Sequence, residues 1–242
     1  MNLVVTMAGA SQRFYDEGYL QPKWSLPIGK GGTVMSRAIE SVDPLLARDD
    51  LLVVVCLEGD EVRARECMAS SSLKDRIMWF TLPEILDGQA LTAARAVEGL
   101  NLQTQQLVVW NVDTVLKGLQ PRGFPRDKNW LCVTELLGDR WSFALVGADG
   151  CVIRTAEKER ISDLASVGLY SFESGALFLD ALDDTNEVSG RTIESYVAPV
   201  YNALIRRGDS VLAVAIDQTQ VLDLGTPSAY QTYIESNPGS VG

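Results

Sequence analysis

Apolar and polar positions alternate along the first half of the chain in blocks that predict strands and helices in turn. Four short and almost continuous apolar runs predict buried strands, at residues 3–7, 51–57, 77–82 and 107–111. The segments between them predict helices, at residues 33–41, 60–70 and 89–99. This alternation is typical of βαβ units. It indicates an α/β fold with a doubly wound, mostly parallel central sheet, in which ligands bind at the carboxyl ends of the strands.

The second half of the chain is richer in strand patterns. We predict strands at residues 130–135, 141–146, 151–155, 166–172, 211–216 and 221–224. Helices are predicted at 173–183 and 193–207, and a last helix begins with Thr226 as its N-cap and Pro227 as its first residue. No repeat, low-complexity tract or linker divides the sequence, so we expect a single domain over residues 1–242 with a frayed tail at 237–242.

Composition excludes several classes of function. The net charge of −11 argues against non-specific binding to nucleic acid or to an anionic membrane. The chain has no histidine, so a Ser-His-Asp triad and a His-ligated zinc site are excluded. Its four cysteines have no CxxC spacing, which favours reduced thiols over a zinc site or a disulfide scaffold. With no signal-peptide pattern and no apolar run long enough to span a bilayer, we expect a cytoplasmic protein.

The loop after the first predicted strand can bind a phosphate chain. Its small residues, at positions 8–11, allow backbone N–H groups to approach an anion closely. Arg13 can grip phosphate oxygens with two hydrogen bonds, and Lys23 adds a point charge. The same pattern also fits an ordinary strand–loop–helix turn with surface cations.

Two aspartates end predicted strands, Asp113 in the segment Asn111-Val112-Asp113 and Asp223 in Val221-Leu222-Asp223. Each can hold a hard divalent cation against phosphates, or serve only as a turn or cap residue. Both could share one Mg²⁺ if the two strands converge.

Three further positions are candidates for ligand contacts. Lys158, beside Glu157, can neutralise a phosphate, although an exposed ion pair is the common alternative. Gln89 can read the edge of a nucleobase or simply begin a helix. Glu194 can accept hydrogen bonds from a substrate or favour the N-terminus of the predicted helix at 193–207.

Taken in chain order, these segments resemble the nucleotidyltransferase superfamily that includes the sugar-1-phosphate nucleotidylyltransferases. The family's opening motif, G-x-G-x-R followed by P-K, is similar to Gly9-Ala10-Ser11-Gln12-Arg13 and Pro22-Lys23, with Ser11 in place of the second glycine. Its two metal-binding motifs are similar to residues 111–113 and 223–227, and its E-K-P motif to Glu157-Lys158, with Glu159 in place of proline. Residues 88–92 look like those of a subgroup encoded with capsule and surface-polysaccharide genes.

The resemblance implies a Rossmann-like enzyme that transfers NMP from a nucleoside triphosphate to a phosphorylated small-molecule acceptor and releases pyrophosphate. It implies that residues 1–113 form the nucleotide-binding half and residues 114–236 the β-rich acceptor-binding half. It assigns Mg²⁺ to Asp113 and Asp223, and the catalytic phosphate contacts to Arg13, Lys23 and Lys158. It places the nucleotide on Ala8, Gly9, Ala10, Ser11 and Gln89, and the acceptor on Glu157, Lys158, Gly168 and Glu194. The nucleotide, the acceptor and a homo-oligomeric state stay open.

Two other functions remain as alternatives. A metal-dependent glycosyltransferase would use a nucleotide-sugar on a related sheet, but such enzymes hold the metal through a D-x-D motif, and this chain has Asn111-Val112-Asp113 instead. An inactive, nucleotide-binding regulatory relative is kept open by Ser11.

Overall fold

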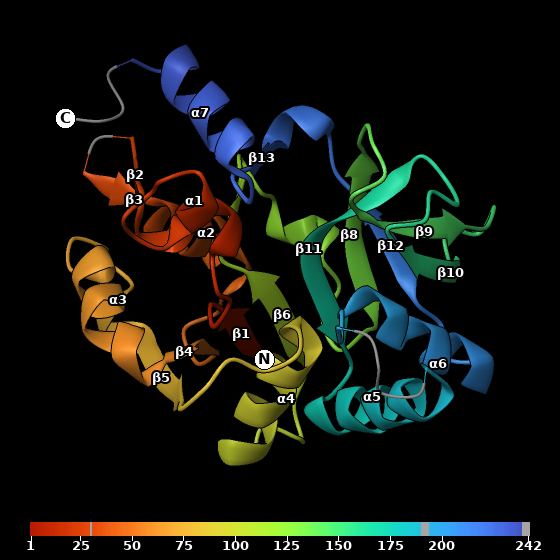
Figure 1. Cartoon of the computed structure of the whole chain (residues 1–242). Helices are drawn as coiled ribbons and strands as arrows, with labels where there is room; N and C mark the ends of the chain where they lie inside the picture. The colour runs from red at the N-terminus through yellow and green to blue at the C-terminus, as the bar shows by residue number, and fades with distance from the viewer. Residues whose placement is uncertain (30, 190–193, 239–242) are drawn as a thin grey trace.

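The computed structural model describes residues 1–29, 31–189 and 194–238. A twisted sheet runs through the molecule (Figure 1). Four of its strands are parallel and lie in the order β5–β4–β1–β6; their bounds are β1 (Asn2–Thr6), β4 (Leu51–Leu57), β5 (Ile77–Leu82) and β6 (Leu107–Asn111). The predicted α/β fold is therefore confirmed, and the predicted strands at 3–7 and 107–111 are neighbours in one sheet.

Antiparallel strands extend this sheet beyond β6. The long strand β11 pairs with β6 and then with both β8 and β9, while β12 runs parallel to β8. Their bounds are β8 (Trp130–Glu135), β9 (Ser142–Val146), β10 (Val152–Glu157), β11 (Leu164–Phe172) and β12 (Leu212–Ala215). The second half of the chain is thus β-rich, as predicted, and shares the sheet of the first half.

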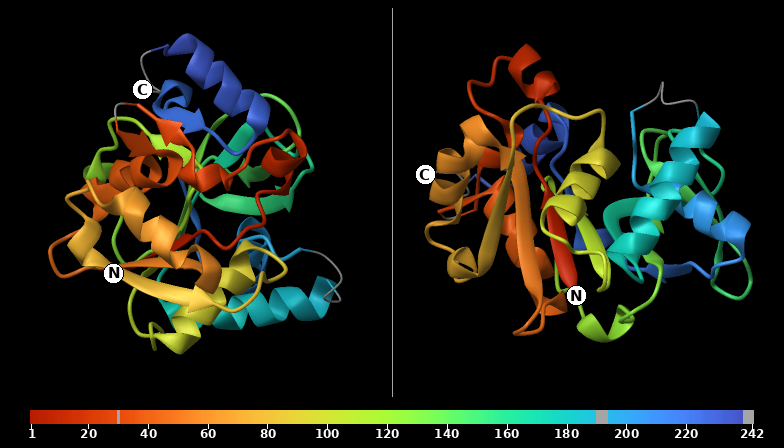
Figure 2. Two further views of the ribbon diagram at one scale, coloured as in Figure 1. Left: turned by 60° about the vertical axis from the view of Figure 1, so that its left-hand side comes forward. Right: turned by 90° about the horizontal axis from the view of Figure 1, so that it is seen from below.

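Helices cover both faces of the sheet (Figure 2). Along β1, Val4 faces a core built with α4, α5 and α6, whereas Leu3 and Val5 face a core built with α2 and α3. This alternation arises because successive side chains of a strand point to opposite faces. The helices are α2 (Val34–Val42), α3 (Glu61–Met68), α4 (Gln89–Gly99), α5 (Gly175–Ser189) and α6 (Tyr201–Arg207).

Short elements form a layer above the carboxyl ends of β1 and β6. They are α1 (Gln12–Asp16), the hairpin β2 (Pro27–Ile28) and β3 (Gly32–Thr33), the pair β7 (Thr114–Leu116) and β13 (Val221–Asp223), and α7 (Pro227–Ser236). Phe14, Leu224 and Tyr230 are buried together in this layer. The hydroxyl of Thr226 accepts a hydrogen bond from the amide of Ala229 at 3.3 Å, which confirms the predicted cap of the last helix.

The predicted helix at 193–207 is wrong in its first part. Residues 194–196 are not helical, Ala198–Val200 form one 3₁₀ turn, and α6 begins only at Tyr201. The predicted start, Ile193, lies outside the described residues. Pro199 lacks an N–H group, and the amide and carbonyl of Ser195 bond to Asp87 and Ala90 instead of to helical neighbours. None of the helices in the described part of the chain combines the length and apolar composition that a membrane span requires.

Candidate active site

A cavity of about 650 Å³ opens at the carboxyl ends of β1 and β6, the edge predicted from the sequence. The loops after these two strands, the loop before α4 and the segment 194–196 supply its walls. Seven predicted site residues line it: Ala8, Gly9, Ala10, Lys23, Gln89, Asp113 and Glu194. The other six do not line it: Ser11, Arg13, Glu157, Lys158, Gly168 and Asp223.

The loop after β1 has Ser11 at the position of the second glycine in the family's motif. Ser11 has φ 52° and ψ 22°, the left-handed conformation that glycine adopts at low cost. Its side-chain oxygen accepts a hydrogen bond from the backbone N–H of Lys23 at 3.2 Å, so the loop and the Pro22-Lys23 segment are joined directly. Arg13 follows on α1, where it is exposed.

Lys23 and Asp113 form an ion pair at the rim of the cavity. The Nζ of Lys23 donates to Oδ2 of Asp113, and both side chains are largely shielded from solvent. Lys23 lies in the 3₁₀ turn Lys23–Ser25, and Asp113 lies between β6 and β7. The turn is fixed because Trp24 and Ser25 are buried. The fold therefore brings together two predicted charged residues that are 90 residues apart in the sequence.

Asp223 lies beside Asp113. Pairing of β13 with β7 sets Asp223 opposite Thr114, and the amide of Leu224 donates to the carbonyl of Asp113 at 2.8 Å. A Cβ built on Gly225 would lie 2.9 Å from Oδ2 of Asp113 and 3.1 Å from Oδ1 of Asp223. The two carboxylate oxygens are therefore at most about 6 Å apart.

The donor set fits Mg²⁺. This ion takes oxygen ligands and is usually held by one or two carboxylates together with waters and substrate phosphates. The glycine at 225 leaves open the space that faces both carboxylates. No group of three or more His, Cys, Asp or Glu side chains that could hold a metal occurs among the described residues. Asp113 and Asp223 would thus hold the ion through two carboxylates, with the rest of its shell supplied by water and substrate.

Arg140 was not found by sequence reasoning. Its Nη2 donates to Oδ2 of Asp223 at 2.5 Å, and its guanidinium carbon lies 4.2 Å from the centre of the Trp141 ring. The two partners are 83 residues apart in the sequence. No local pattern marks Arg140, because the loop between β8 and β9 reaches Asp223 only through the tertiary fold.

Two of the predicted acceptor residues, Lys158 and Glu194, are connected through Tyr196 in a polar network. The Nζ of Lys158 donates to the hydroxyl of Tyr196 at 2.5 Å and lies 4.6 Å from the centre of its ring, and that hydroxyl donates to Glu194. Glu157 accepts a hydrogen bond from Ser142. Since Tyr196 and Glu194 line the cavity, the network links Lys158 to it indirectly. Tyr196 is the second site residue that the sequence analysis did not predict, although it lies only two positions after the predicted Glu194.

The pKa values of three side chains in this region, Glu157, Lys158 and Tyr170, are shifted. Burial raises the pKa of Glu157, although its hydrogen bond from Ser142 and the charge of Lys158 partly offset this effect. The hydrogen bond to Tyr196 raises the pKa of Lys158, so its ammonium form is favoured. Burial raises the pKa of Tyr170 to about 12.

Gly168 lies against Asn111, which lines the larger cavity. It has φ 91° and lies where the register of β11 against β8 shifts, as at a β-bulge. A Cβ at this position would lie 2.4 Å from Nδ2 of Asn111, so only glycine leaves room for that side chain. The Oδ1 atom of Asn111 is buried without a hydrogen-bond partner among the described residues. Gly168 therefore acts through Asn111, which lines the cavity.

Gln89 faces the cavity from the first turn of α4. Its Nε2 donates to the hydroxyl of Thr6 at 2.9 Å, which fixes the amide next to the end of β1. Gly88, with φ 114°, passes so close to Ser195 that a Cβ would lie 2.4 Å from the carbonyl oxygen of Ser195. The loop before α4 and the segment 194–196 are thereby joined along one wall.

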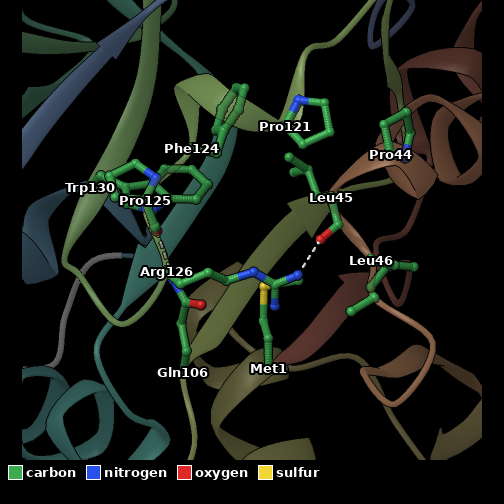
Figure 3. A pocket seen from close by; sticks show the side chains of 11 residues that line it. Met1, Pro44, Leu45, Leu46, Gln106, Pro121, Phe124, Pro125, Arg126 and Trp130 are labelled. Atoms are coloured by element: carbon green, nitrogen blue, oxygen red, sulfur yellow. Dashed lines mark hydrogen bonds between the residues drawn. The ribbon is translucent and has the colours of Figure 1, made fainter.

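A smaller cavity, about 220 Å³, lies at the opposite end of the sheet, where β1 and β6 begin (Figure 3). Phe124, Trp130 and several prolines form its apolar walls, and Arg126 crosses it to donate to the carbonyl of Leu45 at 2.8 Å. No predicted site residue lines this cavity. We therefore assign the candidate chemistry to the larger one.

The parallel sheet and the cavity at its carboxyl edge define a doubly wound nucleotide-binding fold. No protein-family model matches the chain, and no curated protein sequence matches it. Among solved structures, a nucleoside-diphosphate-sugar pyrophosphorylase from Vibrio cholerae RC9 is 30% identical with a TM-score of 0.83, over 96% of this chain and 99% of that one. An inositol-1-phosphate CTP transferase from T. maritima shares the fold at 12% identity and a TM-score of 0.73, over 100% of this chain and 96% of that one. The chain belongs to the family of sugar-phosphate nucleotidyltransferases.

Proposed function

We propose that this protein transfers NMP from a nucleoside triphosphate to a phosphorylated acceptor, a sugar 1-phosphate, and releases pyrophosphate. The observation that carries the proposal is the meeting of Lys23, Asp113 and Asp223 beside the large cavity. These residues come from three distant parts of the chain. A cation and two carboxylates at the carboxyl edge of a parallel sheet suit a metal-bound triphosphate.

The triphosphate lies on the loop after β1 in this proposal. Gly9 and Ala10 line the cavity, and no atom outside the neighbouring residues lies within 4 Å of a Cβ built on Gly9, so an anion has room to approach the backbone there. Lys23 and Arg13 supply the positive charge, and Gln89, which lines the cavity and is held by Thr6, would contact an edge of the nucleobase. Mg²⁺ bound at Asp113 and Asp223 would neutralise charge on the phosphates and orient them.

The chemical step needs no general base. A phosphate oxygen of the acceptor, already ionised, attacks the α-phosphorus in line. A new P–O bond forms as the bond to the β-phosphate bridging oxygen breaks, and that oxygen leaves with pyrophosphate. Catalysis then rests on positioning and on charge stabilisation by Lys23 and Arg13. This accounts for an enzyme without histidine.

The acceptor lies against Glu157 and the network of Lys158, Glu194 and Tyr196. Lys158 carries a stable positive charge and can exchange its hydrogen bond to Tyr196 for one to the acceptor phosphate. The Glu194 carboxylate, exposed on the cavity wall, can accept hydrogen bonds from acceptor hydroxyl groups. We further propose that the product is an activated precursor of surface polysaccharide, which rests on the resemblance of residues 88–92.

Pyrophosphate release tests the proposal. The protein is incubated with Mg²⁺, each nucleoside triphosphate in turn and a panel of sugar 1-phosphates and other phosphorylated acceptors. We expect pyrophosphate with one nucleotide–acceptor pair, and Asp113→Asn should reduce the rate by several orders of magnitude because one metal ligand loses its charge. No pyrophosphate from any pair, together with hydrolysis or transfer from a finished nucleotide-sugar, would instead indicate a glycosyltransferase.

A further inference from the structure

The loop between β8 and β9 is held by one hydrogen bond of its own and by hydrogen bonds from the segment between β10 and β11. Arg160 donates through Nη1 to the carbonyls of Leu136 and Gly138, both at 3.0 Å. The indole N–H of Trp141 donates to the carbonyl of Leu137, also at 3.0 Å. The amide of Lys158 in turn donates to the carbonyl of Trp141 at 2.9 Å. The position of Arg140 is therefore fixed by the fold and tied to the acceptor-side lysine.

Both carboxylate oxygens of Asp223 already have donors. Oδ2 accepts from Arg140 at 2.5 Å, and Oδ1 accepts from the backbone N–H of Gly225 at 3.1 Å. Each oxygen keeps a second lone pair that a metal can use, but a divalent cation bound to Oδ2 would lie next to the guanidinium of Arg140 and repel it. The Gly225 amide is fixed in the turn after β13, whereas the Arg140 side chain is 43% exposed and can rotate away. The guanidinium is thus the donor that yields.

The positive charges beside the two aspartates equal the charge of one divalent cation. Lys23 is paired with Asp113 and Arg140 with Asp223, so two single positive charges neutralise two close carboxylates. A divalent cation carries the same total charge and can replace both. Once displaced, each basic side chain lies beside the place where phosphates would be.

We propose that Arg140 is a positioning residue that holds Asp223 until a divalent cation binds and then becomes a phosphate-binding cation. The inference rests on the proposed function in that it takes Asp223 as a metal ligand. The Trp141 ring supports the guanidinium after displacement, because stacking on an aromatic face does not depend on Asp223.

Metal binding to the substrate-free protein tests this directly. Mn²⁺ serves as the probe, and its free concentration is measured by electron paramagnetic resonance for wild type, Arg140→Ala, Arg140→Lys and Arg154→Ala. Arg154 is the matched control, because it is an exposed arginine whose loss changes the net charge equally and breaks only a surface pair with Glu159. We expect Arg140→Ala to bind Mn²⁺ about tenfold more tightly, since its competitor is gone. Arg140→Lys should lie near wild type, and Arg154→Ala within about twofold of it.

The direction in which the Mn²⁺ affinity changes in Arg140→Ala distinguishes this role from a purely structural one. If Arg140 merely anchored its loop, its loss would weaken or leave unchanged the binding of Mn²⁺, and either result would overturn the proposal. Absence of Mn²⁺ binding in both wild type and Arg140→Ala would also overturn it. Tighter binding without pyrophosphate from any substrate pair would leave the Arg140 inference standing and contradict the proposed function. With an active pair, an unchanged KM for both substrates in Arg140→Ala would remove its phosphate-binding role.

Discussion

Replacing Gly225 with alanine should block the proposed metal site without disturbing the fold. Gly225 is not in the positive-φ region, so its backbone accepts an L side chain. The new Cβ would lie 2.9 Å from Oδ2 of Asp113 and 3.1 Å from Oδ1 of Asp223, whereas ordinary contact begins at 3.4 Å. The oxygens must therefore retreat by about 0.5 and about 0.3 Å. Metal–ligand distances tolerate only about 0.2 Å, so the pair should lose its fit to one ion.

The expected loss is about 10- to 100-fold in metal affinity, the range for substitutions that displace ligands through their surroundings. Mn²⁺ binding to the free protein and the Mg²⁺ dependence of pyrophosphate release both measure it. Gly59→Ala is the control, because no atom lies within 4 Å of its Cβ and Gly59 does not line the cavity. Thermal unfolding should change little in either variant, since Gly→Ala typically stabilises by only about 0.4–1 kcal/mol through the unfolded state. Wild-type metal affinity in Gly225→Ala, or an equal loss in Gly59→Ala, would refute the reasoning.

Three further predictions concern the phosphate contacts, the loop after β1 and the pH dependence of stability. Lys23→Ala should weaken use of the nucleotide and Lys158→Ala should raise the KM for the acceptor, each by about 10- to 100-fold in kcat/KM, because a charge-assisted contact contributes about 1.5–3 kcal/mol. Steady-state kinetics with each substrate varied checks this, and an unchanged acceptor dependence in Lys158→Ala contradicts it. Ser11→Gly should keep its stability within about 1 kcal/mol and remain active, because relief of a left-handed serine offsets the lost hydrogen bond; inactivity of a folded variant argues against this. Burial raises the pKa of Glu157, so its contribution to stability is present below its usual value of 4.5 and is lost as pH rises through the raised one. Glu157→Gln should flatten that fall in the free energy of unfolding, measured by denaturation between about pH 4 and pH 8, and an unchanged slope counts against it.

The parallel half of the fold could be predicted from the sequence because its strands are buried on both faces. Continuous apolar runs then mark each strand from end to end, and the structure has β4, β5 and β6 at the predicted residues. The same runs locate the carboxyl edge of the sheet, and with it the loop at Ala8–Ala10 and Asp113. The neighbouring positions of β1 and β6, and of Asp113 and Asp223, come from pairing between segments more than a hundred residues apart, which hydrophobic periodicity does not encode.

The second half was harder to predict because its elements depend on contacts outside their own sequence. The helix expected at 193–207 is replaced in part by an extended segment whose Ser195 bonds to Asp87 and Ala90, an interaction no local pattern reveals. Gly88 shows the same dependence, since its conformation is required only by the approach of Ser195. Arg140 and Tyr196 were missed for this reason too, because each becomes a site residue only through a partner brought in by the fold.

An acidic protein that binds a polyanion needs its positive charge to be local. The chain carries a net charge of −11, yet charges separated by more than about 8 Å are largely screened in physiological salt, so the nearest cations decide the binding energy. In the free protein each of these cations already has a hydrogen-bond partner: Lys23 bonds to Asp113, Arg140 to Asp223, and Lys158 to Tyr196. Of the three, only Lys23 lines the cavity, and under the proposed function each has a partner that a divalent cation or a phosphate would replace. Binding then exchanges one set of charge pairs for another, so the site is positioned before substrate arrives and need not bury an unpaired charge.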